Sequence, residues 1–204
     1  SCERVFQPMY AHVPVVVASN NDGCIVARSN EVKEAGIPMG APLFKHRRAL
    51  YTMGTAIFSS NYALYADMSA RMMNCFAEFS DQREIYSIDE CFLKLSPADQ
   101  NFALLQQLRE SVRQWVGLPV SVGIAPSKTL AKLANNYAKQ SGQGVYQAHS
   151  VLESRRLATI PVGKIWGIGQ RIANRLIVDG IETAGDFARL TSAQVRLQFG
   201  VVGL

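Results

Sequence analysis

Two adjacent carboxylates separate two strand-like apolar runs in the stretch Tyr86-Ser87-Ile88-Asp89-Glu90-Cys91-Phe92-Leu93. Side chains alternate across a strand, so acids at its end point to different sides unless a turn crowds them together. Such a pair is costly unless a cation or hydrogen bonds stabilise it, and Mg²⁺ prefers hard carboxylate oxygens. The stretch therefore indicates either a metal-binding active site or a hairpin turn that carries two solvated acids.

The composition is that of an ordinary globular protein. A chain of 204 residues, 48% of them hydrophobic, is long enough for one large domain or two to three small ones. No apolar run approaches the ~20 residues that a membrane span needs, so we expect no membrane partner. The cysteines form no Cys-x-x-Cys pair, which predicts reduced cytoplasmic thiols rather than zinc. The chain opens without Met or a signal peptide and stops without a tail, so we expect it to be truncated at both ends.

Charge is unevenly distributed along the chain. Residues 1–95 carry 9 Lys and Arg against 10 Asp and Glu, a net charge of −1. Residues 96–204 carry 12 against 6, a net charge of +6. A basic half beside an acidic centre suits a polyanion that is steered toward a metal site. The alternative is that this modest basicity serves only solubility.

Hydrophobic periodicity and turn residues predict the order of elements. The predicted helices cover residues 1–6, 30–35, 61–79, 99–116 and 127–139. The predicted strands cover 14–18, 24–27, 56–58, 84–88, 91–95 and 120–124, with a short one at 145–146. This alternation predicts an α+β sandwich, in which a sheet lies on one side and helices lie on the other.

The segment from about residue 149 onward is predicted to consist only of helices and turns. Its turn Gly167-Ile168-Gly169 lies between two short helical segments, which is typical of a helix-hairpin-helix. Unobstructed backbone amides at such a turn bind phosphate, and Lys164 and Arg171 would add positive charge. This module would grip the DNA backbone without reading sequence, whereas the alternative is a simple αα-hairpin with glycine turns.

Several strings, taken in chain order, resemble one known family. They are Ser1-Cys2-Glu3-Arg4-Val5-Phe6, Pro14-Val15-Val16-Val17, Ser19-Asn20-Asn21-Asp22-Gly23-Cys24, Phe58-Ser59-Ser60-Asn61-Tyr62, Leu64-Tyr65-Ala66-Asp67-Met68-Ser69, Tyr86-Ser87-Ile88-Asp89-Glu90, Lys128-Thr129-Leu130-Ala131-Lys132-Leu133-Ala134-Asn135 and Trp166-Gly167-Ile168-Gly169. The chain resembles the Y family of translesion DNA polymerases over essentially its whole length, and within it the bacterial UmuC-type branch. The resemblance implies a right-hand polymerase of the α+β class with fingers at 1–60, including a remnant of the N-terminal palm segment. A ferredoxin-like palm at 61–148 and an all-α thumb with the helix-hairpin-helix at 149–204 would follow, without the little-finger domain.

The resemblance also implies a catalytic centre. Asp89 and Glu90 would be catalytic and would bind two Mg²⁺ ions, with Asp89 bridging both and Glu90 on the ion that activates the primer 3′-oxygen. The family's third carboxylate lies a few residues before the Ser-Cys-Glu string, outside this chain, as does its steric-gate residue. Glu3 is expected to cap or pack a helix and not to replace the missing acid.

Two lysines match positions that bind the dNTP phosphates in the family. Lys33 stands in the fingers where much of the family has Arg, so it offers a point charge in place of a fork. Lys139 matches the palm lysine. Asn30 stands where other branches carry a phosphate-binding Tyr, so that contact is not expected here. Solvated helix faces are the alternative interpretation of both lysines.

Three functions fit these patterns. The first is an error-prone, template-directed DNA polymerase of the SOS damage response, which transfers nucleotides from dNTP to a primer 3′-hydroxyl. The second is a non-catalytic DNA-binding remnant, and the third is another palm-type nucleotidyl enzyme such as a cyclase, against which the thumb hairpin argues. The partners implied by resemblance are primer–template DNA and dNTP, with the processed UmuD dimer, RecA and the sliding clamp, in the bacterial cytoplasm. With one of three metal ligands missing, we expect this chain alone to extend a primer very poorly.

Overall fold

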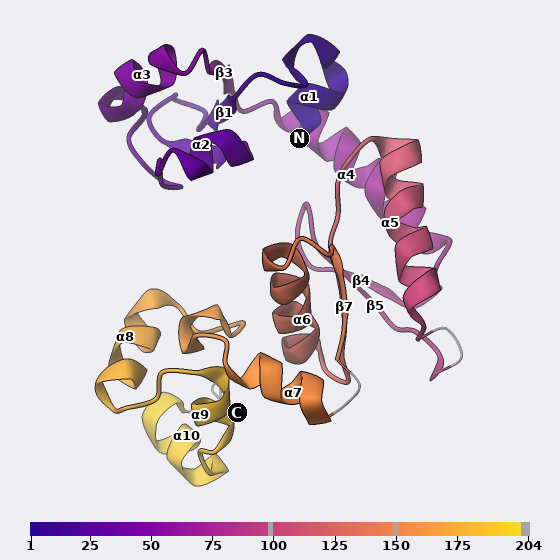
Figure 1. The fold of residues 1–204 in the computed structure, drawn as a ribbon, viewed down its shortest axis with the longest axis vertical. Coiled ribbons are helices and arrows are strands. Elements are labelled where there is room, and N and C mark those ends of the chain that lie inside the picture. The colour runs from indigo at the N-terminus through magenta and orange to yellow at the C-terminus, as the bar shows by residue number, and fades with distance from the viewer. Residues whose placement is uncertain (98–99, 149–150, 201–204) are drawn as a thin grey trace. The chain divides into compact units, whose positions relative to one another are not determined.

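The computed structural model describes residues 1–97, 100–148 and 151–200, in which helices and strands are interspersed up to residue 147 and helices follow (Figure 1). The strands are β1 (Val15–Ala18), β2 (Ile25–Arg28), β3 (Ala56–Ser59), β4 (Arg83–Ile85), β5 (Cys91–Leu93), β6 (Val122–Ile124) and β7 (Val145–Gln147). The helices are α1 (Cys2–Phe6), α2 (Asn30–Glu34), α3 (Leu43–Thr52), α4 (Tyr62–Ala77), α5 (Phe102–Val116), α6 (Lys128–Gln140), α7 (Val151–Ala158), α8 (Gln170–Val178), α9 (Ala184–Ala188) and α10 (Ser192–Phe199), with 3-10 turns η1 (Pro8–Tyr10) and η3 (Val162–Lys164). The mixed α+β class predicted from the sequence is confirmed.

Most elements lie close to their predicted ranges. The helix predicted from residue 99 begins at Phe102, and residue 99 itself lies outside the described residues. α3 occupies a stretch for which no element is predicted. Within the described part of the chain, no helix is long and apolar enough to cross a bilayer.

The chain divides into two compact units. The first consists of Ser1–Lys94 and Ser111–Pro119, and the second of Leu95–Glu110 and Val120–Leu204. The long helix α5 therefore contributes to both units. The region predicted as a palm, 61–148, is divided between them, and the predicted domain limits stay a prediction.

A three-stranded sheet of order β2-β1-β3 organises the start of the first unit. β1 pairs antiparallel with β2 and parallel with β3, and its four residues are all buried. Val32 of α2 and Leu43 and Leu50 of α3 belong to the cluster of buried residues that includes β1. One face of each helix thus packs on this sheet, as the apolar run of the central strand predicts.

The rest of the first unit positions the acidic pair. Asn61 caps α4 by accepting a hydrogen bond from the Leu64 amide at 3.0 Å. The buried face of this helix carries Met68, Met72 and Phe76, which are spaced four residues apart. β4 and β5 then form an antiparallel hairpin in which Ile85 lies opposite Cys91. The first strand is shorter than the predicted 84–88, because the chain turns directly after Ile85.

The second unit holds β6 and β7, which pair in parallel, and α6, which packs closely on β6. A β-carbon added to Gly123 in β6 would lie 2.7 Å from the carbonyl carbon of Ala134 and closer still to the Asn135 amide nitrogen. The strands described in 61–148 are arranged as two two-stranded sheets, β4-β5 and β6-β7.

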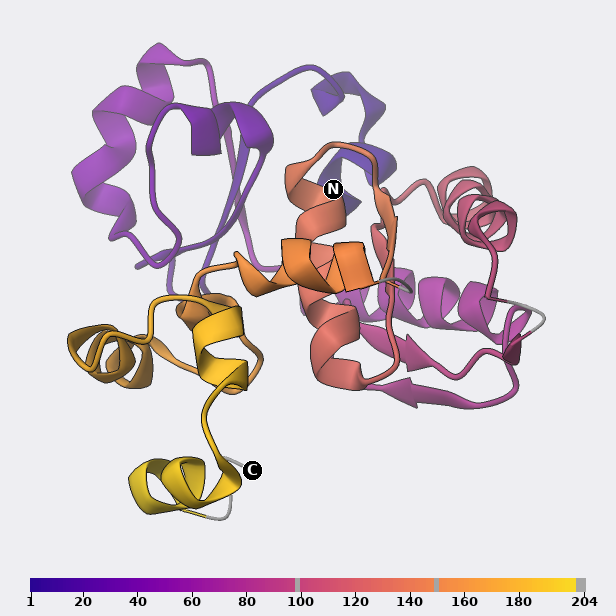
Figure 2. The same cartoon turned by 60° about the horizontal axis from the view of Figure 1, so that its bottom comes forward.

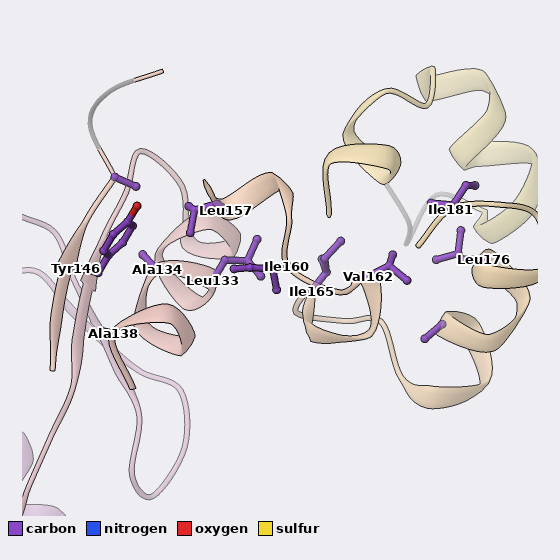
Figure 3. Packing of buried hydrophobic residues seen from close by; sticks show 12 residues of the cluster. Leu133, Ala134, Ala138, Tyr146, Leu157, Ile160, Val162, Ile165, Leu176 and Ile181 are labelled. Carbon is purple, nitrogen blue, oxygen red and sulfur yellow. The ribbon is translucent and has the colours of Figure 1, made fainter. Parts of the chain in front are cut away.

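One continuous core joins α6 and β7 to the short helices that follow (Figure 3). The residues in this cluster are Leu133, Ala134, Ala138, Tyr146, Ala148, Leu157, Ile160, Val162, Ile165, Ala173, Leu176 and Ile181. In Figure 2 this segment, coloured orange to yellow, is a succession of short helices. The segment after residue 150 is helical, as predicted, but it shares its core with residues of the predicted palm.

Candidate active site

The acidic pair lies at the tip of the β4–β5 hairpin. The backbone amides of Tyr86 and Ser87 both donate to the carbonyl oxygen of Glu90, at 3.0 and 3.2 Å. These two hydrogen bonds close the loop between β4 and β5, because both amides bind the one carbonyl of Glu90 and do not continue the strand pairing. The turn predicted for this stretch is therefore present.

The loop is fixed from two sides. The Ser87 hydroxyl donates to Oδ1 of Asp89 at 2.9 Å, which orients that carboxylate within the turn. The Ser69 hydroxyl, on α4, donates to the carbonyl oxygen of Ile88. The Asp89 side chain is exposed and that of Glu90 is half-buried. Sequence reasoning did not find the role of Ser69, because it lies 19 residues from its partner and only the fold brings the two together.

The donor set of this tip fits a hard cation. Mg²⁺ is commonly held by one or two protein carboxylates together with substrate phosphates and waters. Asp89 and Glu90 supply two carboxylates at an accessible loop. Within the described ranges, no group of three or more His, Cys, Asp or Glu side chains gathers to hold a metal.

The two predicted phosphate lysines lie in different units. Lys33 is exposed on α2 in the first unit, and its Nζ donates to Oδ1 of Asn30 at 3.2 Å. Asn30, which is not expected to contact phosphate, thus orients the Lys33 side chain through this hydrogen bond. Lys139 is exposed in the last turn of α6 in the second unit. Asp89 and Glu90 share the first unit with Lys33.

The glycine turn of the second unit leads directly into α8. Gly167 has a φ of +91°, a left-handed conformation that favours glycine. Gly169 is the N-cap of α8 at a φ of −78°, and no side chain caps this helix end. A β-carbon at either glycine would meet nothing within 4 Å, so the turn is open to solvent. The flanking cations Lys164 and Arg171 are both exposed.

Glu3 has a structural partner in the first unit. Its side chain is only 4% exposed, and its Oε1 accepts a hydrogen bond from the Tyr65 hydroxyl at 2.7 Å. Burial, and then this hydrogen bond, raise the pKa of Tyr65 to about 12. The pair links α1 to α4, which agrees with the expectation that Glu3 packs a helix. No sequence signal identifies Tyr65 as its partner.

Comparison with known proteins supplies a family and a fold. Residues 1–136 match the model of the impB/mucB/samB family. Protein UmuC of Salmonella typhimurium strain LT2 is 44% identical over 209 residues, which cover 99% of this chain and 50% of that protein. Protein MucB of Escherichia coli is 44% identical over 208 residues, with the same coverage of 99% and 50%.

Solved structures match over the whole chain. A Dbh ternary complex with partially disordered substrates superposes with a TM-score of 0.83 at 25% identity, covering 99% of this chain and 60% of that one. DinB from Sulfolobus solfataricus gives a TM-score of 0.82 at 25% identity, covering 98% and 60%. The chain spans about half the length of the curated relatives it matches.

Proposed function

The chain belongs to the impB/mucB/samB family, and we propose that it is the nucleotide-adding part of a Y-family translesion DNA polymerase. The predicted resemblance to this family is confirmed by the UmuC relative and by the polymerase structures, one of them named a Y-family DNA polymerase chimera. The observation that carries the proposal is the carboxylate pair Asp89–Glu90, held by Ser69 and Ser87 at the tip of a hairpin within this fold.

The proposed reaction joins a dNTP to the primer. The primer 3′-oxygen attacks the α-phosphorus, a new P–O bond forms, and the bond to pyrophosphate breaks. Asp89 and Glu90 would hold the Mg²⁺, two ions by resemblance, which when bound lowers the pKa of the 3′-hydroxyl and neutralises the triphosphate. Lys33 and Lys139 would offset the negative charge of the triphosphate and of the leaving pyrophosphate.

The proposed arrangement assigns fingers to 1–60, a ferredoxin-like palm to 61–148 and a thumb to 149–204. In the thumb, the turn Gly167-Ile168-Gly169 would act as a helix-hairpin-helix. Its support is the uncapped N-terminus of α8, whose first amides can donate to a phosphate oxygen. Lys164 and Arg171 would contact the same DNA backbone.

The whole protein's surroundings are proposed from the similarity to UmuC. The partners would be primer–template DNA, dNTP, the processed UmuD dimer, RecA and the sliding clamp, in the bacterial cytoplasm. Error-prone synthesis past lesions in the SOS response would be the biological role.

DNA binding is tested by fluorescence anisotropy with a labelled primer–template. We expect affinity that is independent of sequence and falls with salt, because phosphate contacts release counterions. Arg171→Ala should reduce the slope of log affinity against log salt by about 1. Arg196→Ala is the matched control, since Arg196 is an exposed arginine of α10 outside the proposed contact. A salt-independent affinity would contradict the proposal.

Catalysis is tested by primer extension. We expect a longer protein that contains these residues and has the full length of the relatives to extend a primer. In that longer protein, Asp89→Asn should abolish extension while primer–template binding persists. A longer protein that binds DNA with salt dependence but adds no nucleotide would favour the alternative function, a non-catalytic DNA-binding remnant.

A further inference from the structure

One face of α3 is aromatic and cationic. Phe44, Arg47, Arg48 and Tyr51 stand at positions i, i+3, i+4 and i+7, which lie on the same side of a helix. We call these four side chains the α3 face. Phe44 is 71% exposed and Tyr51 is 87% exposed. Two large rings are therefore in contact with solvent on one side of a single helix.

The other side of α3 explains why the helix holds this face outward. Leu43 and Leu50 are 2% and 0% exposed and belong to the cluster under the three-stranded sheet. In Figure 2, α3 is the purple helix beside the strands of this sheet, with one side turned away from them. The two rings lie outside the core because they are on the opposite side of the helix from Leu43 and Leu50. A rotation of the helix that buried the rings would expose these leucines.

The charge of the α3 face is unopposed. α3 contains no Asp or Glu, and Lys45 adds a third cation with its Nζ 6.0 Å from the centre of the Phe44 ring. Across the described ranges, no ion pair or hydrogen bond involves the guanidinium group of Arg47 or Arg48. A surface with free guanidinium groups beside exposed rings is complementary to a ligand that has both anionic groups and flat apolar faces.

We propose that the α3 face binds single-stranded nucleic acid. This proposal rests on the proposed function, under which the ligand is the unpaired template strand. Single strands offer phosphates and unstacked bases, and proteins that hold them combine a basic track with aromatic stacking platforms. Phe44 and Tyr51 are seven residues apart, about 10 Å along the helix at 1.5 Å per residue. Arg47 and Arg48 lie between the rings along the helix, where they would meet phosphates of a strand whose bases stack on Phe44 and Tyr51.

Other occupants use this chemistry less completely. Duplex DNA presents phosphates but keeps its base faces stacked, so the two rings would gain nothing from it. An acidic protein would use only the arginines, so this alternative predicts that an unpaired overhang adds nothing to the affinity for DNA.

The test compares two DNAs with the 204-residue chain by fluorescence anisotropy. One is a blunt duplex, and the other carries a 5′ template overhang of about 10 nucleotides, within the usual site size. We expect the overhang to raise wild-type affinity at least tenfold, since stacking contributes about 1–3 kcal/mol per base and two rings are available. The double variants Phe44→Ala/Tyr51→Ala and Arg47→Ala/Arg48→Ala should lose this gain while their affinity for the blunt duplex stays unchanged.

Salt dependence separates the two variants. Removing two phosphate contacts on a single strand should lower the salt slope of Arg47→Ala/Arg48→Ala by about 1.4. The aromatic variant should keep the wild-type slope. Phe102→Ala and Arg155→Ala/Arg156→Ala are matched controls, because these residues are an exposed ring and two exposed arginines elsewhere. Thermal unfolding of each variant verifies that the first unit is intact.

Each outcome decides between the proposals. An overhang that adds nothing to wild-type affinity, or variants that retain the full gain, would overturn the role of the α3 face and leave DNA polymerisation standing. If the wild type binds neither DNA, the proposed function fails. Binding to oligo(dT) of about 16 nucleotides then tests by itself whether the α3 face binds a single strand. Self-association that is lost in the aromatic variant, seen by sedimentation without any overhang effect, would identify a protein interface and refute single-strand binding.

Discussion

Tyr65→Phe removes one oxygen atom and thereby isolates a buried carboxylate. The hydroxyl donates to Oε1 of Glu3 at 2.7 Å, and Glu3 is 4% exposed. A hydrogen bond to a charged group contributes about 1.5–3 kcal/mol, and a buried carboxylate that loses its donor bears most of that loss. We expect the free energy of unfolding of the first unit to fall by about 2 kcal/mol at neutral pH.

Tryptophan fluorescence isolates the relevant unit. The chain has two tryptophans, Trp115 in the first unit and Trp166 in the second. In a Trp166→Phe background, urea unfolding followed at Trp115 therefore reports on the unit that contains the Tyr65–Glu3 pair. A double-mutant cycle with Glu3→Gln then measures the pair itself. With a neutral acceptor, Tyr65→Phe should cost only about 1 kcal/mol.

The pH dependence gives an independent check. Because the pKa of Tyr65 is raised to about 12, its stabilising contribution is complete below the unfolded value of about 10 and is lost as the pH rises through 12. The stability difference between wild type and Tyr65→Phe should therefore shrink over that window. A cost below about 0.5 kcal/mol, or an equal cost in the Glu3→Gln background, would refute the role assigned to this hydrogen bond.

Further substitutions test other parts of the fold. Gly123→Ala should destabilise the second unit by about 3 kcal/mol, because its β-carbon would overlap the backbone of α6; urea unfolding followed at Trp166 measures this. Gly167→Ala should cost about 1–2 kcal/mol because its φ is +91°, whereas Gly169→Ala, at a φ of −78°, should cost much less in the same assay. Hydrogen bonding from the Ser29 side chain is the main cause that lowers the pKa of Glu31 to about 2, so its contribution is complete above about pH 4.3 and is lost as the pH falls toward 2. Glu31→Gln should reduce the loss of unfolding free energy over that pH window by less than about 1 kcal/mol, since the side chain is 44% exposed. An acid-unfolding transition identical to that of the wild type would contradict this.

Local signals in the sequence predicted the elements that depend on neighbouring residues. The helix predicted at 127–139 starts at Ser127, and the Ser127 hydroxyl accepts a hydrogen bond from the Leu130 amide at 3.3 Å. In the segment predicted to consist of helices and turns, Thr183 forms a complete capping box with Asp186. Such caps involve residues three apart, so the chemistry that creates them is visible in a short window.

Contacts between distant residues were not predictable in this way. The Tyr65 hydroxyl meets Glu3 across 62 positions, and β3 pairs in parallel with β1 after a long connection. α3 escaped prediction because its buried residues, Leu43 and Leu50, are few, while its outward face includes two rings that read as core. For the candidate site, the sequence indicated the carboxylates and the turn, but the bond from Ser69 that fixes the loop depends on tertiary structure.

The continuous core that joins α6 to α8 also bears on motion (Figure 3). Close-packed elements move together, because sliding one past another opens voids that cost about 24 cal/mol per Å³. Lys139 and the turn Gly167-Ile168-Gly169 consequently travel as one body. If the turn grips the duplex as proposed, a displacement of the turn when the duplex advances would also displace Lys139. Under that proposal, the shared core would couple the entry of a nucleotide to the translocation of DNA without a direct contact between the two substrates.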